Sequence, residues 1–184
     1  MFRHRIDEHT ELRLMVPADA AELFALTEAQ RAHLRRWLPW LDSVKSSSDS
    51  AGFIQLTLRQ FSERQGFNAA IVHDGAIVGV IGHHRIAWAN RSTSLGYWLA
   101  ASHEGRGIMT AACRVLVQHA FTEYALHRVE IRCATGNARS CAIPERLGFR
   151  REGLLREAEW LYERFVDHYV YGLLANEWKT AAGA

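Results

Sequence analysis

The sequence is poor in cysteine and proline, with three of each, and no apolar run approaches the ~20 residues that a membrane-spanning helix needs. No membrane partner is therefore expected. Cys113, Cys133 and Cys141 lie in apolar stretches without the spacing of a metal site, which predicts small buried residues. Their odd number fits a reducing compartment and no apolar signal segment opens the chain, so we expect a cytoplasmic location.

Charge and histidine spacing disfavour two further classes of function. A net charge of +2 is too small and too evenly spread to predict a nucleic-acid partner. Ten histidines are present, but none has the His-x-x-x-His or His-x-x-Glu-His spacing that places two ligands on one helix face, so no metal is expected. With 184 residues, 48% of them hydrophobic, the chain can bury one sizeable core, which predicts a single domain over residues 1–184.

A glycine-rich turn, Glu104-Gly105-Arg106-Gly107, is the most informative feature that the sequence does contain. Before it, residues 94–99 are aromatic and apolar, as in a half-buried strand; after it, apolar residues recur at helical spacing from Ile108 to Ala120. Glycines let the backbone approach a ligand closely, and the free N–H groups and dipole of a helix start favour an anion. The pattern predicts a pyrophosphate-binding turn, with Arg106 adding positive charge at its rim.

Similar turns occur in other settings. Many strand-to-helix connections use glycine without any ligand, so a purely structural turn stays an alternative. A dinucleotide-binding fold would need a third glycine where Thr110 stands. A nucleoside-triphosphate loop would need Gly-Lys-Ser or Gly-Lys-Thr, and no lysine stands there. Both nucleotide-binding folds are disfavoured.

A second strand and helix follow the first pair. Residues 127–133 alternate polar and apolar, and Asn137-Ala138-Arg139-Ser140 and then Gly148-Phe149 come after them. Together the two motifs resemble those of the GNAT superfamily of acetyl-coenzyme A-dependent N-acetyltransferases. Within it the chain is most similar to the RimJ/RimL type, the ribosomal-protein N-terminal acetyltransferases. The likeness covers nearly the whole chain, including residues 10–14, 34–40, 107–110 and 166–174.

The resemblance implies an α/β fold, with one mixed, mainly antiparallel central sheet flanked by helices. Local patterns give a matching order of elements. A strand is followed by two helical segments, the second spanning about 51–64 and capped by Ser46–Ser50. A hairpin of residues 69–72 and 77–82 then turns at Asp74-Gly75, before a strand, a helix, a strand, a helix and a final strand pair.

The resemblance also implies acetyl-coenzyme A (acetyl-CoA) as co-substrate, and it assigns cofactor-binding residues. The pantetheine arm would pair with the strand backbone and with the motif asparagine, and the pyrophosphate would bind the turn. Glutamate departs from the Gln or Arg usual at the first position of the turn, so we expect weaker cofactor binding at worst. The residues implied are Tyr97, Trp98, Leu99, Glu104, Gly105, Arg106, Gly107, Ile108, Met109, Thr110, Asn137 and Ser140.

The thiolate that leaves acetyl-CoA needs a proton or a hydrogen-bond donor. Many GNAT enzymes use a tyrosine seven positions after the motif asparagine, but Pro144 stands there. By resemblance to RimL, Ser140 would stabilise the thiolate instead; the alternative is a serine that merely caps or begins its helix. Pro144 cannot donate to the carbonyl of Ser140, which leaves that turn loosened or filled by water.

Four carboxylates are candidates for the general base. In RimL-like proteins a glutamate before an aromatic residue faces the acceptor amine, which favours Glu159. Glu157 shares strand parity with Glu159 and would point to the same face. Glu163 and Asp167 are close enough in sequence to compete, although Asp167 is expected to be structural.

The acceptor side is predicted from aromatic and histidine residues, namely Trp37, Trp40, His84 and Trp160. The two tryptophans at 37 and 40 lie three apart on a predicted helix, so core packing is an equal alternative. In the pair His83-His84, one ring is expected to face the core and the other the opposite face. The acceptor implied is the α-amine of a protein N-terminus such as that of a ribosomal protein, attacking the thioester directly in a ternary complex.

Two other functions stay open. One is acetylation of a small-molecule amine, a polyamine or an antibiotic. The other is a catalytically silent coenzyme A-binding module, which would need the glycine turn but neither Ser140 nor Glu159. The sequence also leaves a homodimer open.

Overall fold

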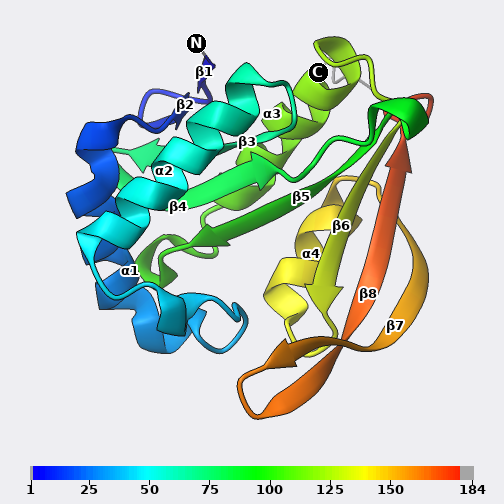
Figure 1. Cartoon of the computed structure of the whole chain (residues 1–184). Helices are drawn as coiled ribbons and strands as arrows, with labels where there is room; N and C mark the ends of the chain where they lie inside the picture. Colours follow the sequence, from blue (N-terminus) through cyan, green and yellow to red (C-terminus); the bar gives the residue numbers. More distant parts are fainter. Residues whose placement is uncertain (1, 179–184) are drawn as a thin grey trace.

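The computed structural model describes residues 2–178, and Figure 1 shows a twisted sheet with helices on its faces. All eight strands form one sheet in the order β1-β2-β3-β4-β5-β6-β8-β7. The strands are β1 (Arg3–Arg5), β2 (Thr10–Leu14), β3 (Phe67–His73), β4 (Ala76–His83), β5 (Ser92–Leu99), β6 (Arg128–Ala134), β7 (Arg150–Leu161) and β8 (Arg164–Leu174). The helices are α1 (Ala20–Leu34), α2 (Ser47–Ser62), α3 (Ile108–Thr122) and α4 (Ala138–Arg146).

The fold class and the order of elements are confirmed, with one additional short strand, β1, that the sequence did not predict. The hairpin of β3 and β4 turns at Asp74-Gly75 as expected. Helix α2 begins before the predicted position because Ser46 is its N-cap and the carboxylate of Asp49 accepts from the amides of Ser46 and Lys45, each at 2.9 Å. Most of the serine-rich patch therefore forms the first turn of the helix.

The sheet separates two apolar clusters because successive strand residues point to opposite faces. Ala69 and Ile71 of β3 join the cluster that includes α3 and α4, whereas Ala70 and Val72 join Met15 and the residues of α1 and α2. Burial on both faces of the central strands fixes their register, since a slip of one residue would exchange the two sets of side chains. No helix within residues 2–178 is long and apolar enough to span a bilayer.

The pairing of β5 with β6 positions the site. It is the parallel pair of the sheet, and it runs only from Ser92↔Arg128 to Leu95↔Ile131. Beyond Leu95, β5 stays paired with β4 and β6 stays paired with β8, so the two strands diverge (Figure 1). The divergence leaves one backbone edge of residues 96–99 without a neighbouring strand.

Candidate active site

A cavity of about 2100 Å³ opens where β5 and β6 diverge. It is bounded by the start of α3, the first turn of α4, the α1–α2 loop and the β7–β8 hairpin. The predicted site residues that line it are Trp37, Trp40, His84, Tyr97, Trp98, Leu99, Glu104, Gly105, Gly107, Ile108, Met109, Thr110, Asn137, Ser140 and Glu159. Arg106 and Trp160 do not line it.

The glycine turn has the backbone geometry expected of an anion site. Gly105 and Gly107 have φ of 75° and 80°, in the left-handed region that residues with a Cβ rarely adopt. The first hydrogen bond of α3 runs from the amide of Ala111 to the carbonyl of Gly107 at 3.0 Å. The amides of Ile108, Met109 and Thr110 are therefore available at the helix start, as a phosphate requires.

Glu104 does not present an unpaired charge to this turn. One carboxylate oxygen lies 2.8 Å from Nε2 of His33, and the other is paired with the guanidinium of Arg139. Glu104 thus joins the end of α1 to the first turn of α4. His33 and Arg139 both line the cavity and were missed at the sequence level, although Arg139 stands inside the Asn137–Ser140 motif.

Asn137, rather than Ser140, caps helix α4. Its side-chain carbonyl oxygen accepts from the amide of Ser140 at 3.2 Å. The hydroxyl of Ser140 is left for other partners, and it lies 3.3 Å from Sγ of Cys133 and 3.4 Å from the hydroxyl of Tyr97. The capping alternative for Ser140 is therefore wrong; Ser140 stands in the first turn of α4 and lines the cavity.

The carbonyl of Ser140, which Pro144 leaves without a helical donor, has a partner from another element. The phenol of Tyr97, on β5, donates to it at 3.2 Å. Neither a loosened turn nor a filling water is needed. Burial raises the pKa of Tyr97 well above 10, so this phenol stays protonated and remains a donor. Burial also raises the pKa of Cys133 to about 12, which keeps that thiol neutral beside Ser140.

Glu159 is the carboxylate of the β7–β8 hairpin that lines the cavity. Its side chain is 30% exposed, and its Oε2 lies 3.5 Å from Nε2 of His168 on β8. Glu157 does not line the cavity beside Glu159, contrary to the prediction from strand parity, because the register shifts between Leu155 and Glu159 and Glu157 itself has φ of 48°. Asp167 accepts from the amide of Glu157 at 2.7 Å, which is the structural role predicted for it.

Glu163 and Asp167 do not line the cavity, and neither does Trp160. Trp160 is 52% exposed and packs edge-on against Phe165, with ring centroids 4.8 Å apart. The reason is strand geometry: adjacent residues of a strand point to opposite faces, so Glu159 and Trp160 do not share one. Trp160 therefore lies outside the cavity wall that carries Glu159.

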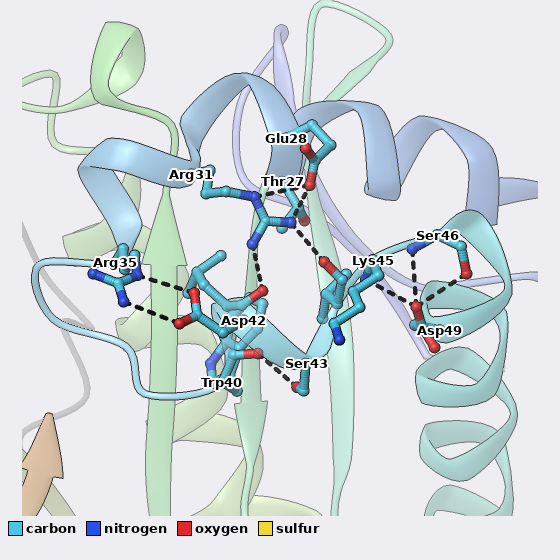
Figure 2. A network of polar contacts seen from close by, with 12 residues as sticks. Thr27, Glu28, Arg31, Arg35, Trp40, Asp42, Ser43, Lys45, Ser46 and Asp49 are labelled. Carbon is cyan, nitrogen blue, oxygen red and sulfur yellow. Dashed lines mark hydrogen bonds and ion pairs between the residues drawn. The ribbon is translucent and has the colours of Figure 1, made fainter. Parts of the chain in front are cut away.

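Trp37 and Trp40 lie in a loop, not on a helix as predicted, because α1 ends at Leu34. The loop is held by arginines from the end of α1 (Figure 2). Arg31 donates to the carbonyls of Leu41 and Val44, and Arg35 binds both carboxylate oxygens of Asp42 at 2.9 and 3.0 Å. These contacts fix the loop that carries both tryptophans on the cavity wall.

The loop is also tied to the opposite wall. The hydroxyl of Tyr162, at the turn of the β7–β8 hairpin, donates to the carbonyl of Leu38 at 2.7 Å. The guanidinium of Arg35 lies 3.7 Å from the centre of the Tyr162 ring. The wall that carries the tryptophans and the wall that carries Glu159 are thus joined by one side chain, a contact that local sequence patterns do not predict.

His83, the last residue of β4, and His84, which follows it, face opposite sides as predicted. His83 is 1% exposed and packs between Phe67 and His119, whereas His84 lines the cavity with its Nδ1 2.9 Å from the hydroxyl of Ser94. Burial, with the nearby charge of Arg132, lowers the pKa of His84, so its ring is neutral at pH 7. It can offer a hydrogen bond without adding charge.

The arrangement combines an anion-binding turn, a hydroxyl beside the point where β5 and β6 part, and a carboxylate on the hairpin wall. Such a set can hold a phosphorylated cofactor, stabilise a leaving anion and accept a proton. Among residues 2–178, no group of three His, Cys, Asp or Glu side chains is placed to hold a metal ion.

Comparison with known proteins agrees with this geometry. Residues 9–150 match the family model described as an acetyltransferase (GNAT) domain. YdaF of Bacillus subtilis (strain 168), provisionally named a ribosomal N-acetyltransferase, is 38% identical over 181 residues, covering 97% of this chain and 98% of YdaF.

Two solved structures are similar over most of their length. RimL, a ribosomal L7/L12 alpha-N-protein acetyltransferase in complex with coenzyme A, has a TM-score of 0.90 and 25% identity, covering 94% of this chain and 98% of RimL. The microcin C7 self-immunity acetyltransferase MccE, in complex with acetyl-CoA and AMP, has a TM-score of 0.87 and 28% identity, covering 92% and 94%. The chain belongs to the GNAT acetyltransferase family, and it is an N-acetyltransferase.

Proposed function

We propose that this enzyme transfers the acetyl group of acetyl-CoA to the α-amine of a protein or peptide N-terminus, such as that of a ribosomal protein. The observation that carries the proposal is that the glycine turn, Ser140 and Glu159 all line one cavity. A cofactor site and an acceptor site that share one cavity allow direct attack within a ternary complex. The enzyme class excludes the catalytically silent alternative.

The cofactor fits the residues present. Its pyrophosphate would lie on the amides at the start of α3, with Arg139 and His33 beside it, and its pantetheine arm would follow the unpaired edge of residues 96–99. This placement leads the thioester toward Ser140. Asn137 uses its carbonyl oxygen to cap α4, so its amide N–H₂ is the group left for the pantetheine.

In the reaction, the amine nitrogen forms a bond to the acetyl carbon while the carbon–sulfur bond breaks. Glu159 takes the first proton that the ammonium must lose, directly or through water. The attacking nitrogen loses its second proton as the amide forms, and the departing thiolate, which accepts a hydrogen bond from Ser140, takes up a proton to become the free thiol. An α-amine has a pKa of about 7.7–8.0, against about 10.4 for a lysine side chain, so it is deprotonated far more easily near neutral pH. That difference favours an N-terminus as acceptor.

The acceptor class is supported by two of the relatives. RimL carries the name of a ribosomal-protein α-N-acetyltransferase, and YdaF that of a ribosomal N-acetyltransferase. A second candidate is a small-molecule amine, because MccE, which is named for microcin C7 self-immunity and was solved with AMP, is similar over nearly its whole length.

Mass spectrometry separates the two candidates. The enzyme is incubated with acetyl-CoA and a mixture of N-terminal peptides, polyamines and aminoglycosides. Acetylation of peptide α-amines, lost in Glu159→Gln, supports the proposal. Acetyl groups found on small amines or lysine side chains, and never on peptide α-amines, would overturn it.

A further inference from the structure

We propose that the hydroxyl of Tyr97 is a positioning group that orients Ser140 toward the sulfur of the cofactor. The inference rests on the proposed role of Ser140. Tyr97 lies on β5 and Ser140 in the first turn of α4, the helix that follows β6, and the two residues are 43 positions apart in sequence. The phenol contacts Ser140 twice, at the carbonyl (3.2 Å) and at the hydroxyl (3.4 Å).

The first contact exists because of Pro144. In a regular helix the amide of residue 144 would donate to the carbonyl of Ser140, but proline has no N–H. The carbonyl is therefore left to an outside donor, and the phenol of Tyr97 takes that place. A single hydroxyl replaces the missing helical bond and anchors the first turn of α4 to the sheet.

The second contact follows from the first. Since the phenol proton is directed to the carbonyl, the phenol oxygen is left as an acceptor, and Ser140 donates to it at 3.4 Å. This is a long bond, which the serine hydroxyl can exchange for a shorter one to a nearby thiolate. The competing acceptor within reach is Sγ of Cys133, at 3.3 Å on the neighbouring strand.

Tyr97 acts through Ser140, not as the acid itself. Its burial keeps the phenol protonated at a pKa well above 10, so transfer of its proton to a thiolate is unfavourable. Without the phenol oxygen, the Ser140 hydroxyl keeps Cys133 as its acceptor and turns from the sulfur of the cofactor. Loss of the Tyr97 hydroxyl should therefore lower the rate of the chemical step, while the affinity for acetyl-CoA is retained.

The test is Tyr97→Phe, which removes one oxygen and keeps the ring. Single-turnover rates are measured with the full-length enzyme, and the dissociation constant of acetyl-CoA is measured by calorimetry. We expect the rate to fall roughly tenfold, the loss typical of one hydrogen bond, with an affinity within about twofold of wild type. In the Ser140→Ala background, Tyr97→Phe should cause almost no further loss, because the two groups act as a unit.

Tyr171→Phe is the matched control. Tyr171 is 1% exposed and its hydroxyl donates to Glu145 of α4 at 2.9 Å, but it does not line the cavity. The Tyr171→Phe variant should lose thermal stability, as Tyr97→Phe does, but it should keep the wild-type rate. A wild-type rate in Tyr97→Phe, or an equal loss with and without Ser140, overturns the inference. A wild-type rate in Ser140→Ala overturns the proposed chemistry instead, so the two failures are distinguishable.

Discussion

Gly107→Val should abolish most acetyl-CoA binding while costing little of the fold. The backbone at Gly107 has φ of 80°, and apart from Gly107 and its two chain neighbours no residue has an atom within 4 Å of the place where a Cβ would stand. The penalty is therefore backbone strain of about 1–2 kcal/mol, with no steric clash in the core. A valine relieves that strain by changing the turn, which moves the amides of the anion site.

Gly75→Val provides a matched control. Gly75 has φ of 82°, an equally open Cβ position and a place in the β3–β4 turn outside the cavity. Both variants should lose similar stability in the absence of ligand. Only Gly107→Val should lose the gain in stability that acetyl-CoA provides.

Thermal unfolding measures that response. A ligand at a hundredfold excess over its dissociation constant adds about 2.7 kcal/mol to the stability of a protein that binds it only when folded. For a chain of this length the gain corresponds to a rise in Tm of about 5–11 °C. Wild type and Gly75→Val should show the full rise and Gly107→Val a small fraction of it. An equal rise in all three proteins would place the cofactor elsewhere.

Two further predictions concern the acceptor wall and the core. Arg31→Met removes the donor to the carbonyls of Leu41 and Val44, so the loop should loosen and the KM for the acceptor should rise about tenfold, with the KM for acetyl-CoA unchanged in steady-state assays. Burial lowers the pKa of His83 from 6.5 to about 3, so the native state holds it neutral while the unfolded chain protonates it. Stability should therefore fall as the pH drops from 6.5 toward 3, by up to about 1.4 kcal/mol per pH unit. In urea unfolding at pH 7 and pH 4.5, His83→Phe should reduce that loss; the same loss in both proteins would contradict it.

Sequence patterns predicted the elements of the cofactor side because residues close together in the chain determine each of them. The strand at 94–99, the glycine turn and the helix from Ile108 are consecutive, and their periodicity and glycine content are enough to identify them. The hairpin about Asp74-Gly75 was predictable for the same reason. Each of these features depends on residues within a few positions of one another, so a single sequence is enough to predict it.

The acceptor side was less predictable because it depends on irregular backbone and distant contacts. The left-handed conformation of Glu157 shifts the register of β7, and no glycine or Asn marks it. On the cofactor side, the bond from Tyr97 to Ser140 was unpredictable for the same reason, because it joins residues 43 positions apart and local sequence marks only Pro144. The position of Trp160 could have been predicted, since alternation along a strand places Trp160 and Glu159 on opposite faces.

The tie between Tyr162 and Leu38 has a consequence for the exchange of acceptor preference between enzymes of this family. It spans 124 positions of the sequence, and it makes the tryptophan loop and the β7–β8 hairpin two parts of one wall. A chimera that receives only the loop from another family member would keep its own β7–β8 hairpin. The two segments would then come from different proteins, and nothing would ensure the hydrogen bond that joins them. Acceptor preference should therefore move between family members only when both segments are transplanted together.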